Sequence, residues 1–312
     1  MEISILLAEQ ILAMFLTMAV GFGVVRAGLF KTEDSRIISN MVVYICNPCV
    51  VVHSFQIELT DDKIKELMIA IGLSVVVHMV LIIGSEILSF IFHFNSIEKA
   101  SIIYTNAGYL VIPLVGAVLG EEWVFYTTAF ILVQTVLMWT HGVKLIGQEK
   151  KLNIRKILCN PNVIAMIIGI ALFALEIRLP TVVDSCVSGF GDMISPASMM
   201  VIGMVIGDVD LKWVFRQKRP YLICLLRLIV FPLIAVVAFA GLERSGIHPD
   251  AEYILMIVLI ATSAPAAAMI TQLAQIYGKD SRYASVINVM SVIFCIITMP
   301  VMVLSYEMLI AL

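Results

Sequence analysis

Membrane-length apolar stretches recur along the whole chain, and they constrain its fold more than any other feature. The 312 residues are 61% hydrophobic and 14% charged, whereas soluble domains are about half apolar and a quarter charged. A helix needs about 20 apolar residues to cross a bilayer. The sequence therefore predicts an all-α integral membrane protein with ten spans, over residues 4–28, 37–57, 64–92, 97–119, 123–146, 160–177, 181–206, 214–242, 252–277 and 282–311.

The distribution of positive charge supports this count and predicts the orientation of the chain. Of the 20 lysines and arginines, 15 fall in or beside connections that follow odd-numbered spans, and only four follow even-numbered spans. Cytoplasmic connections carry the excess of positive charge in membrane proteins. We therefore expect a multi-pass protein of the cell membrane, surrounded by lipid, with its basic loops in the cytoplasm and both termini outside.

A basic connection near the middle of the chain divides the spans into two sets of five. The predicted units are a first repeat over residues 1–146, a cytoplasmic linker over 147–159 and a second repeat over 160–312. An odd number of spans in each half forces the second half to enter the membrane in the opposite direction. The two halves are thus expected to form an inverted repeat.

Two of the predicted spans are interrupted at matching places in the two halves. The fourth span contains Tyr104–Pro113 and the ninth contains Ala261–Ala268, and both segments are rich in residues that break helices. Paired interruptions of this kind mark the binding sites of many carriers. An unsatisfied backbone group in hydrocarbon costs several kcal/mol, so such a segment must face protein, water or a ligand. We therefore expect both segments to line a cavity.

Several short motifs lie in and around the interrupted spans. They are Ser263-Ala264-Pro265-Ala266, Gln272–Gly278, Ala284-Ser285, Met299-Pro300, Asn106 with Ile112-Pro113-Leu114, Pro196-Ala197-Ser198 with Gly203, and Asn47-Pro48. These motifs resemble those of the auxin efflux carrier family. The similarity is strongest in the last two spans and extends to the second, fourth and seventh. The short central connection is similar to that of bacterial members, which include malate and malonate permeases, and differs from the long loop of the plant auxin exporters.

This resemblance implies a fold and a function. The fold is that of two inverted five-helix repeats, as in bile-acid and sodium–proton carriers, in which helices four and nine cross at their breaks. One part of the molecule serves as a scaffold, through which a homodimer forms, and the other as a transport domain. The implied function is secondary transport of small organic anions by alternating access, with auxin-like monocarboxylates or malate- and malonate-like dicarboxylates as substrates.

Asn106 is the leading candidate for contact with the substrate. Where broken helices meet, the N-terminal N–H groups favour an anion, and an asparagine can both donate and accept. Alternatively, Asn106 satisfies backbone groups that the break has freed. Many relatives carry a further asparagine or proline near the ninth-span break, where this chain has Ala266–Ala268. With no arginine near either break, the sequence favours a monoanion.

Other residues near the interruptions are candidates for substrate binding, each with a structural alternative. The prolines interrupt helices whether or not they contact a ligand, and the serines can bond to their own helix. Asn47 and Ser195 either line a gate or serve helix packing. The substrate-binding set is Asn106, Gly108, Tyr109, Pro113, Ser263, Ala264, Pro265, Asn47 and Ser195.

Ionisable residues inside predicted spans suggest further roles. Asp192 is a candidate proton or sodium site, which would make the protein a coupled carrier of the bile-acid type; the alternative is a hydrogen-bonded residue near the outer surface. Glu86 and Arg227 are both about two turns from the predicted cytoplasmic face. We expect them to form a structural ion pair.

An enzymatic function is the remote alternative. Gly189-Phe190-Gly191-Asp192 matches the GxGD motif of intramembrane aspartyl proteases, but that chemistry needs two carboxylates that share a proton. No partner carboxylate is evident at the depth of Asp192. Cys46-Asn47-Pro48-Cys49 has redox spacing, but no nearby base or second cysteine pair accompanies it. We therefore expect no enzyme activity, cofactor, metal site or nucleic-acid partner.

Overall fold

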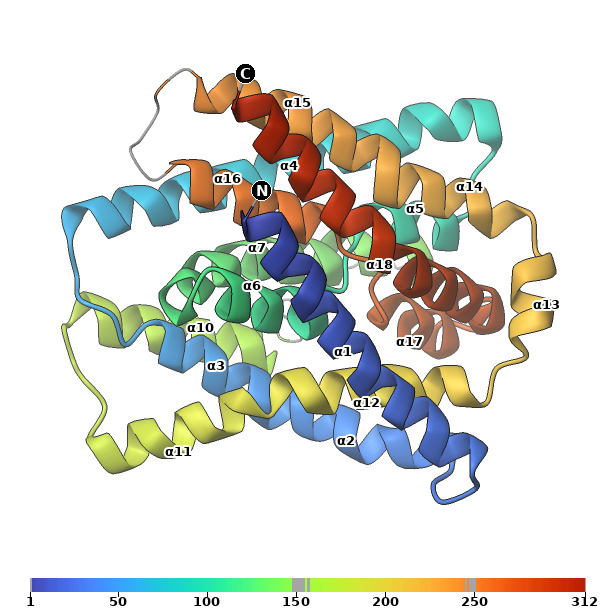
Figure 1. Ribbon diagram of the computed structural model, residues 1–312, viewed down its shortest axis with the longest axis horizontal. Helices are drawn as coiled ribbons and strands as arrows, with labels where there is room; N and C mark the ends of the chain where they lie inside the picture. Colours follow the sequence, from blue (N-terminus) through green and yellow to red (C-terminus); the bar gives the residue numbers. More distant parts are fainter. Residues whose placement is uncertain (1, 148–154, 156–157, 245, 247–250, 312) are drawn as a thin grey trace.

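The computed structural model describes residues 2–147, 155, 158–244, 246 and 251–311 (Figure 1). This part of the chain is helical and contains no strand. Seven of its helical stretches are long and apolar enough to cross a membrane, and Ala107–Val118, Pro161–Ala174 and Ala251–Ser263 are shorter apolar helices. The all-helical membrane class is confirmed, whereas the total of ten spans and the inverted repeat stay predictions. Most of the predicted linker over 147–159 lies outside the described residues.

The helices of the first half follow one another with short connections. In chain order they are α1 (Glu2–Arg26), η1 (Thr32–Asp34), α2 (Ser35–Met41), η2 (Val42–Cys46), α3 (Asn47–Ser54), α4 (Asp61–Phe92), α5 (Ser96–Ile103), η3 (Ala107–Val111), α6 (Ile112–Val118), η4 (Glu121–Trp123), α7 (Val124–Leu137), η5 (Met138–Gly142) and α8 (Val143–Gly147).

The second half has a similar succession of long and broken helices. In chain order they are α10 (Pro161–Ala174), α11 (Thr181–Asp192), α12 (Ile194–Gly207), α13 (Leu211–Arg216), α14 (Arg219–Leu225), η6 (Leu226–Val230), α15 (Phe231–Glu243), α16 (Ala251–Ser263), α17 (Met269–Ile276) and α18 (Ser281–Ile310).

The helices pack as two bundles. In the first bundle, α12 lies against α1 and α2, and α3 lies against α10 and α11. In the second bundle, α4 contacts α5, α7 and α16, and α18 contacts α14 to α17. Figure 1 shows α2, α3, α11 and α12 along its lower edge and α4, α14 and α15 along its upper edge. The broken helices therefore belong to the second bundle, and η3 and α6 also contact the first at α12 and α1.

Glycines allow the backbones of α1 and α12 to approach closely. A β-carbon on Gly203 would overlap the carbonyl oxygen of Met18, and one on Gly21 would overlap that of Met200. Small residues at helix interfaces let membrane helices pack backbone against backbone. This contact makes α1 and α12 the tightest-packed pair of the first bundle.

Proline positions explain three of the π-helical segments. The segments η2, η3 and η6 each end two residues before a proline, namely Pro48, Pro113 and Pro232. A proline has no N–H and its ring clashes with the carbonyl four residues earlier, so the preceding turn widens. Two of the widened turns, η2 and η3, lie next to the cavity described below, and the third positions Arg227.

Candidate functional site

The first interruption is a short extended segment between two helical pieces. The helix α5 ends at Ile103, Tyr104 adopts an extended conformation, and the chain becomes helical again at Ala107. In the second interruption, α16 ends at Ser263 and α17 begins at Met269. Pro265 contributes to this break because it has no N–H to donate to the preceding turn.

The two interruptions lie side by side and bond to each other through their backbones. Thr105 and Ala266 form an antiparallel bridge. The Asn106 N–H donates to the Pro265 carbonyl at 2.8 Å, and the Ala267 N–H donates to the Tyr104 carbonyl at 3.0 Å. These contacts satisfy backbone groups that the breaks release, as the interior of a membrane protein requires.

A glutamine on α7 satisfies the backbone groups of Thr105 in the first break. The Oε1 atom of Gln134 accepts from the Thr105 N–H at 2.8 Å and from its hydroxyl at 2.9 Å. Its Nε2 donates to the Thr105 carbonyl at 2.9 Å. One side chain thus replaces the helical partners that Thr105 has lost.

Two residues of α18 provide hydrogen-bond partners for the backbone groups of the second break. The Ala266 N–H donates to the hydroxyl of Ser291 at 3.1 Å, and Asn288 Nδ2 donates to the Ala266 carbonyl at 2.6 Å. Gln134, Asn288 and Ser291 were not among the sequence-based candidates. One feature of the sequence could have identified them: each is a polar residue in the apolar span that directly follows an interrupted span.

The expected ion pair between Glu86 and Arg227 is wrong. Glu86 accepts from Lys99 Nζ at 2.8 Å. Arg227 is completely buried, and its Nε and Nη1 donate to the carbonyls of Ala264 and Ile102, both at 3.1 Å. The physical reason is that the helix ends at the breaks expose carbonyls that bind the guanidinium, while the short turn after α4 brings Lys99 to Glu86. An arginine therefore does lie near the breaks in space, contrary to the expectation from the sequence.

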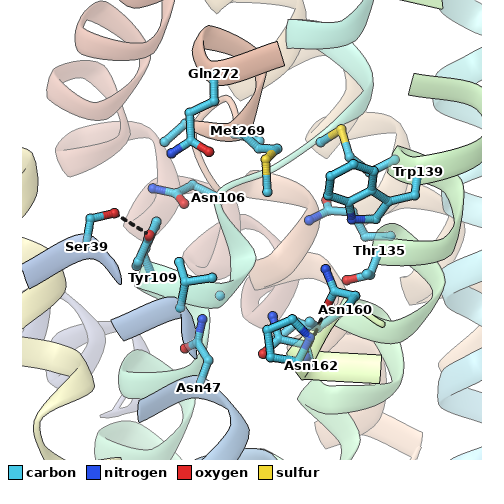
Figure 2. Close-up of a pocket in the computed structure, with 18 of the residues that line it drawn as sticks. Ser39, Asn47, Asn106, Tyr109, Thr135, Trp139, Asn160, Asn162, Met269 and Gln272 are labelled. Carbon is cyan, nitrogen blue, oxygen red and sulfur yellow. Dashed lines mark hydrogen bonds between the residues drawn. The ribbon is translucent and has the colours of Figure 1, made fainter. Parts of the chain in front are cut away.

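A cavity of about 330 Å³ lies between the two bundles, beside the paired interruptions. We call it the first cavity. The first bundle contributes residues of α2, η2, α3 and the start of α10, and the second bundle contributes the breaks, α7, η5 and α17. Figure 2 shows its main polar and aromatic side chains, which are Ser39, Asn47, Asn106, Tyr109, Thr135, Trp139, Asn160, Asn162 and Gln272.

The amide of Asn106 lies at the first cavity without a partner among the described residues. Asn106 makes no side-chain cap bond to the helix that follows it, and its Nδ2 is buried. The freed backbone groups are bound by Gln134, Asn288 and Ser291 instead. The bridging role that the sequence left open for Asn106 is thus taken by other residues.

Further amides face the same space. The Oδ1 atoms of Asn47 and Asn162 are buried and have no partner in the part of the chain that the structure describes, and both residues line the first cavity. Buried polar atoms normally have partners, so unpartnered ones beside a cavity indicate a place for a polar ligand or water. None of the described residues that line this cavity is charged.

Three helical segments begin at the first cavity. They start at Ala107, Pro161 and Met269, and residues at each start line the cavity. The first N–H groups of a helix have no partner within it and carry partial positive charge. Some of these N–H groups already have partners, since Asn160 accepts from the Asn162 N–H and the Ile270 and Thr271 N–H groups donate to carbonyls of the second break. The partial positive charge of the three starts and the uncharged wall still suit an anion whose remainder is apolar, because Trp139 and Met138 also line the cavity.

A second cavity of about 270 Å³ lies farther along the same helices. It is lined by Val50 and His53 of α3 and by Ile112, Pro113 and Ala117 of α6, together with Asp192 and Ser195. The two cavities therefore adjoin successive parts of the chain from Asn106 to Ala117, and both lie between the two bundles. His53 Nδ1 also lies 2.9 Å from Asp184 Oδ1.

The predicted site residues thus separate into three groups. Asn47, Asn106, Gly108 and Tyr109 line the first cavity. Pro113, Asp192 and Ser195 line the second. The ninth-span residues Ser263, Ala264 and Pro265 are buried and line neither cavity.

Comparison with known proteins places this geometry in a family. The family described as membrane transport protein matches the chain twice, over residues 6–154 and 149–303. No curated protein matches the sequence. The two matched segments together cover nearly all of the chain, including both interruptions and both cavities. The chain belongs to the membrane transport protein family, which is the auxin efflux carrier family.

Proposed function

We propose that the protein is a secondary carrier of small organic anions and that the first cavity is its binding site. The observation that carries this proposal is the free Asn106 amide at a helix start, in a cavity between the two bundles. The partial positive charge of the helix starts and the Asn106 amide favour a carboxylate, and Trp139 and Met138 offer an apolar wall. A substrate bound here contacts both bundles at once.

The uncharged wall supports a monocarboxylate over a dicarboxylate. A second carboxylate would lose its hydration without a cation among the described lining residues, and such burial is costly. Arg227 lies beside the breaks in space, so a lack of arginine there does not account for a preference for a monoanion. The preference follows instead from the lining of the first cavity, which the Arg227 side chain does not reach.

Movement of one bundle against the other would carry the substrate between the two cavities. Contacts between the bundles hold the described conformation: Tyr109 OH and the Ser39 hydroxyl are 3.2 Å apart, and Ser198 donates to the Tyr109 carbonyl at 3.0 Å. These bonds must break when the bundles move. The first cavity is the cytoplasmic one under the orientation that the loop charges predict, with both termini outside and the protein in the cell membrane.

A coupled carrier is the second candidate. Asp192 and His53 both line the second cavity and can bind a cation or a proton. Transport into proteoliposomes that is unchanged without a sodium gradient and with the proton gradient collapsed would argue against coupling. Loss of transport under either condition would support it.

We also propose that the protein forms a homodimer through the first bundle. The residues Leu12, Leu16 and Val20 follow one another at helical spacing on α1 and are each more than half exposed. This apolar row can face lipid or a second copy. Cross-linking of a Leu16→Cys variant across a dimer would support the assembly, and a monomeric mass in detergent and in nanodiscs would argue against it.

A thermal-shift screen of the purified protein tests the proposed function. The panel contains monocarboxylates such as phenylacetate and indoleacetate, the dicarboxylates malate and malonate, and the neutral amides of the aromatic acids. We expect aromatic monocarboxylates to raise the melting temperature and the neutral amides to have a smaller effect. Stabilisation by none of the acids would contradict the proposal.

A further inference from the structure

Arg227 occupies an unusual position beside the paired breaks. It is completely buried, and it bonds to the carbonyls of Ile102 and Ala264, which lie at the C-terminal ends of α5 and α16. A single side chain thus contacts both broken helices. Its Nη2 is buried and has no partner among the residues that the structure describes. A charge at membrane depth is costly and generally serves a function.

The two contacts place positive charge where the broken helices carry negative charge. A helix C-terminus carries about −0.5 of an elementary charge and an N-terminus about +0.5. The guanidinium therefore offsets the ends of α5 and α16, which it touches. The starts at Ala107 and Met269, which adjoin the first cavity, keep their positive partial charge.

We propose that Arg227 sets the charge preference of the first cavity without touching the substrate. Its positive charge cancels the negative partial charge of the carbonyl ends of α5 and α16. The positive partial charge of the helix starts then dominates at the first cavity and attracts a bound anion. This inference rests on the proposed function, since it assumes that the first cavity holds an organic anion. Arg227 is in this sense a positioning and selectivity residue.

The distance allows such an effect. Ala264 and Ala267 are three positions apart in the chain, and Ala267 lines the first cavity, so their Cα atoms are at most about 11 Å apart. A full charge about 10 Å from a carboxylate, at an effective dielectric constant of about 20, changes affinity by about tenfold. The affinity for a neutral ligand of the same shape does not depend on this charge.

A matched pair of ligands separates this role from a purely structural one. Phenylacetate and phenylacetamide differ in charge and little in shape. Arg227→Gln removes the charge and keeps two N–H donors, whereas Arg227→Lys keeps the charge. Arg282→Gln is the control, because Arg282 is an exposed residue that packs over the ring of Trp213. Affinities are measured by isothermal titration of the full-length protein in detergent.

We expect wild type to prefer phenylacetate by about tenfold. Arg227→Gln should lose about tenfold in affinity for phenylacetate and stay within twofold for phenylacetamide, while Arg227→Lys and Arg282→Gln keep the preference. An equal loss for both ligands, or an unchanged preference in Arg227→Gln, would overturn the inference. If Arg227→Gln does not fold, the test is made on Arg227→Lys. Loss of the preference for phenylacetate over phenylacetamide in Arg227→Lys would overturn the inference. Wild type that binds none of the acids overturns the proposed function and this inference with it.

Discussion

The backbone N–H of Asn106 donates to the carbonyl of Pro265 at 2.8 Å, which joins the two interrupted helices at their breaks. The Asn106 backbone is thereby fixed by the partner helix, while its side-chain Nδ2 has no partner within the described ranges of the chain. The same residue therefore anchors the paired breaks and presents an amide to the first cavity. Substitutions can therefore separate the residues that hold the breaks from those that bind the substrate.

Replacing Gln134 with leucine should destabilise the protein. The Thr105 N–H and carbonyl would both lose their partner in a buried place, at a cost of about 2 kcal/mol or more. We expect a clear fall in the melting temperature in detergent. Gln272→Leu is the control, because Gln272 is exposed at the first cavity and should leave the melting temperature unchanged. Equal melting temperatures for Gln134→Leu and wild type would show that Gln134 does not support the break.

Gly203→Ala should weaken the contact between α1 and α12. The added methyl group overlaps the Met18 carbonyl, and overpacking of this kind typically costs about 1 to 3 kcal/mol. The measurement is the melting temperature in detergent. Gly23→Ala on α1 provides the control, since a β-carbon there meets nothing within 4 Å. A fall for Gly23→Ala as large as that for Gly203→Ala would refute the close packing.

Glu86→Gln should have a small effect on stability. The side chains of Lys99 and Glu86 are 17% and 45% exposed, and an ion pair with such access to solvent contributes about 1 kcal/mol or less. A double-mutant cycle with Lys99→Met should give a coupling energy of that size. If such cycles instead showed coupling between Glu86 and Arg227 and none between Glu86 and Lys99, the ion pair expected from the sequence would be correct.

Tyr109→Phe should shift the balance between conformations. The change removes the contact with Ser39 between the bundles, which contributes about 0.5 to 1.5 kcal/mol, or a shift of up to about tenfold. In a cysteine-free background, cysteines placed at Ser195 in the second cavity and at Thr135 in the first should change reactivity toward a thiol reagent in opposite directions. Unchanged reactivity at both positions would mean that this contact does not hold the described conformation. Ser305→Ala is the control, because the Ser305 hydroxyl bonds only within its own helix, to the Val301 carbonyl.

The two helix breaks could be predicted from the sequence, but the side chains that form hydrogen bonds to them could not. Gly108, Pro113 and Pro265 disfavour continuous helix through local backbone chemistry, which can be read without a fold. The partners of the breaks are distant in the chain, since Gln134 and Asn288 reach them from the helices α7 and α18. Only packing brings those side chains to the released backbone groups.

Arg227 shows a second limit of sequence reasoning. Opposite charges at similar predicted depth suggested a pair with Glu86, but depth does not define which helices are neighbours. The carbonyls at a helix end are invisible as partners in a sequence, although they bind cations well. The separation of Asn106 and Pro113 into two cavities likewise depends on where the first bundle contacts η3 and α6.

The affinity of Asn106→Ala for the best acid of the screen tests the central claim most directly. Equilibrium binding is measured by isothermal titration on wild type, Asn106→Ala and the control Asn40→Ala, which changes an exposed amide that lines the same cavity. The melting temperature of each variant checks that it is folded. The account predicts at least about a tenfold loss for folded Asn106→Ala, equal to 1.4 kcal/mol, and a change within twofold for Asn40→Ala. An Asn106→Ala protein that binds the acid with wild-type affinity would contradict it.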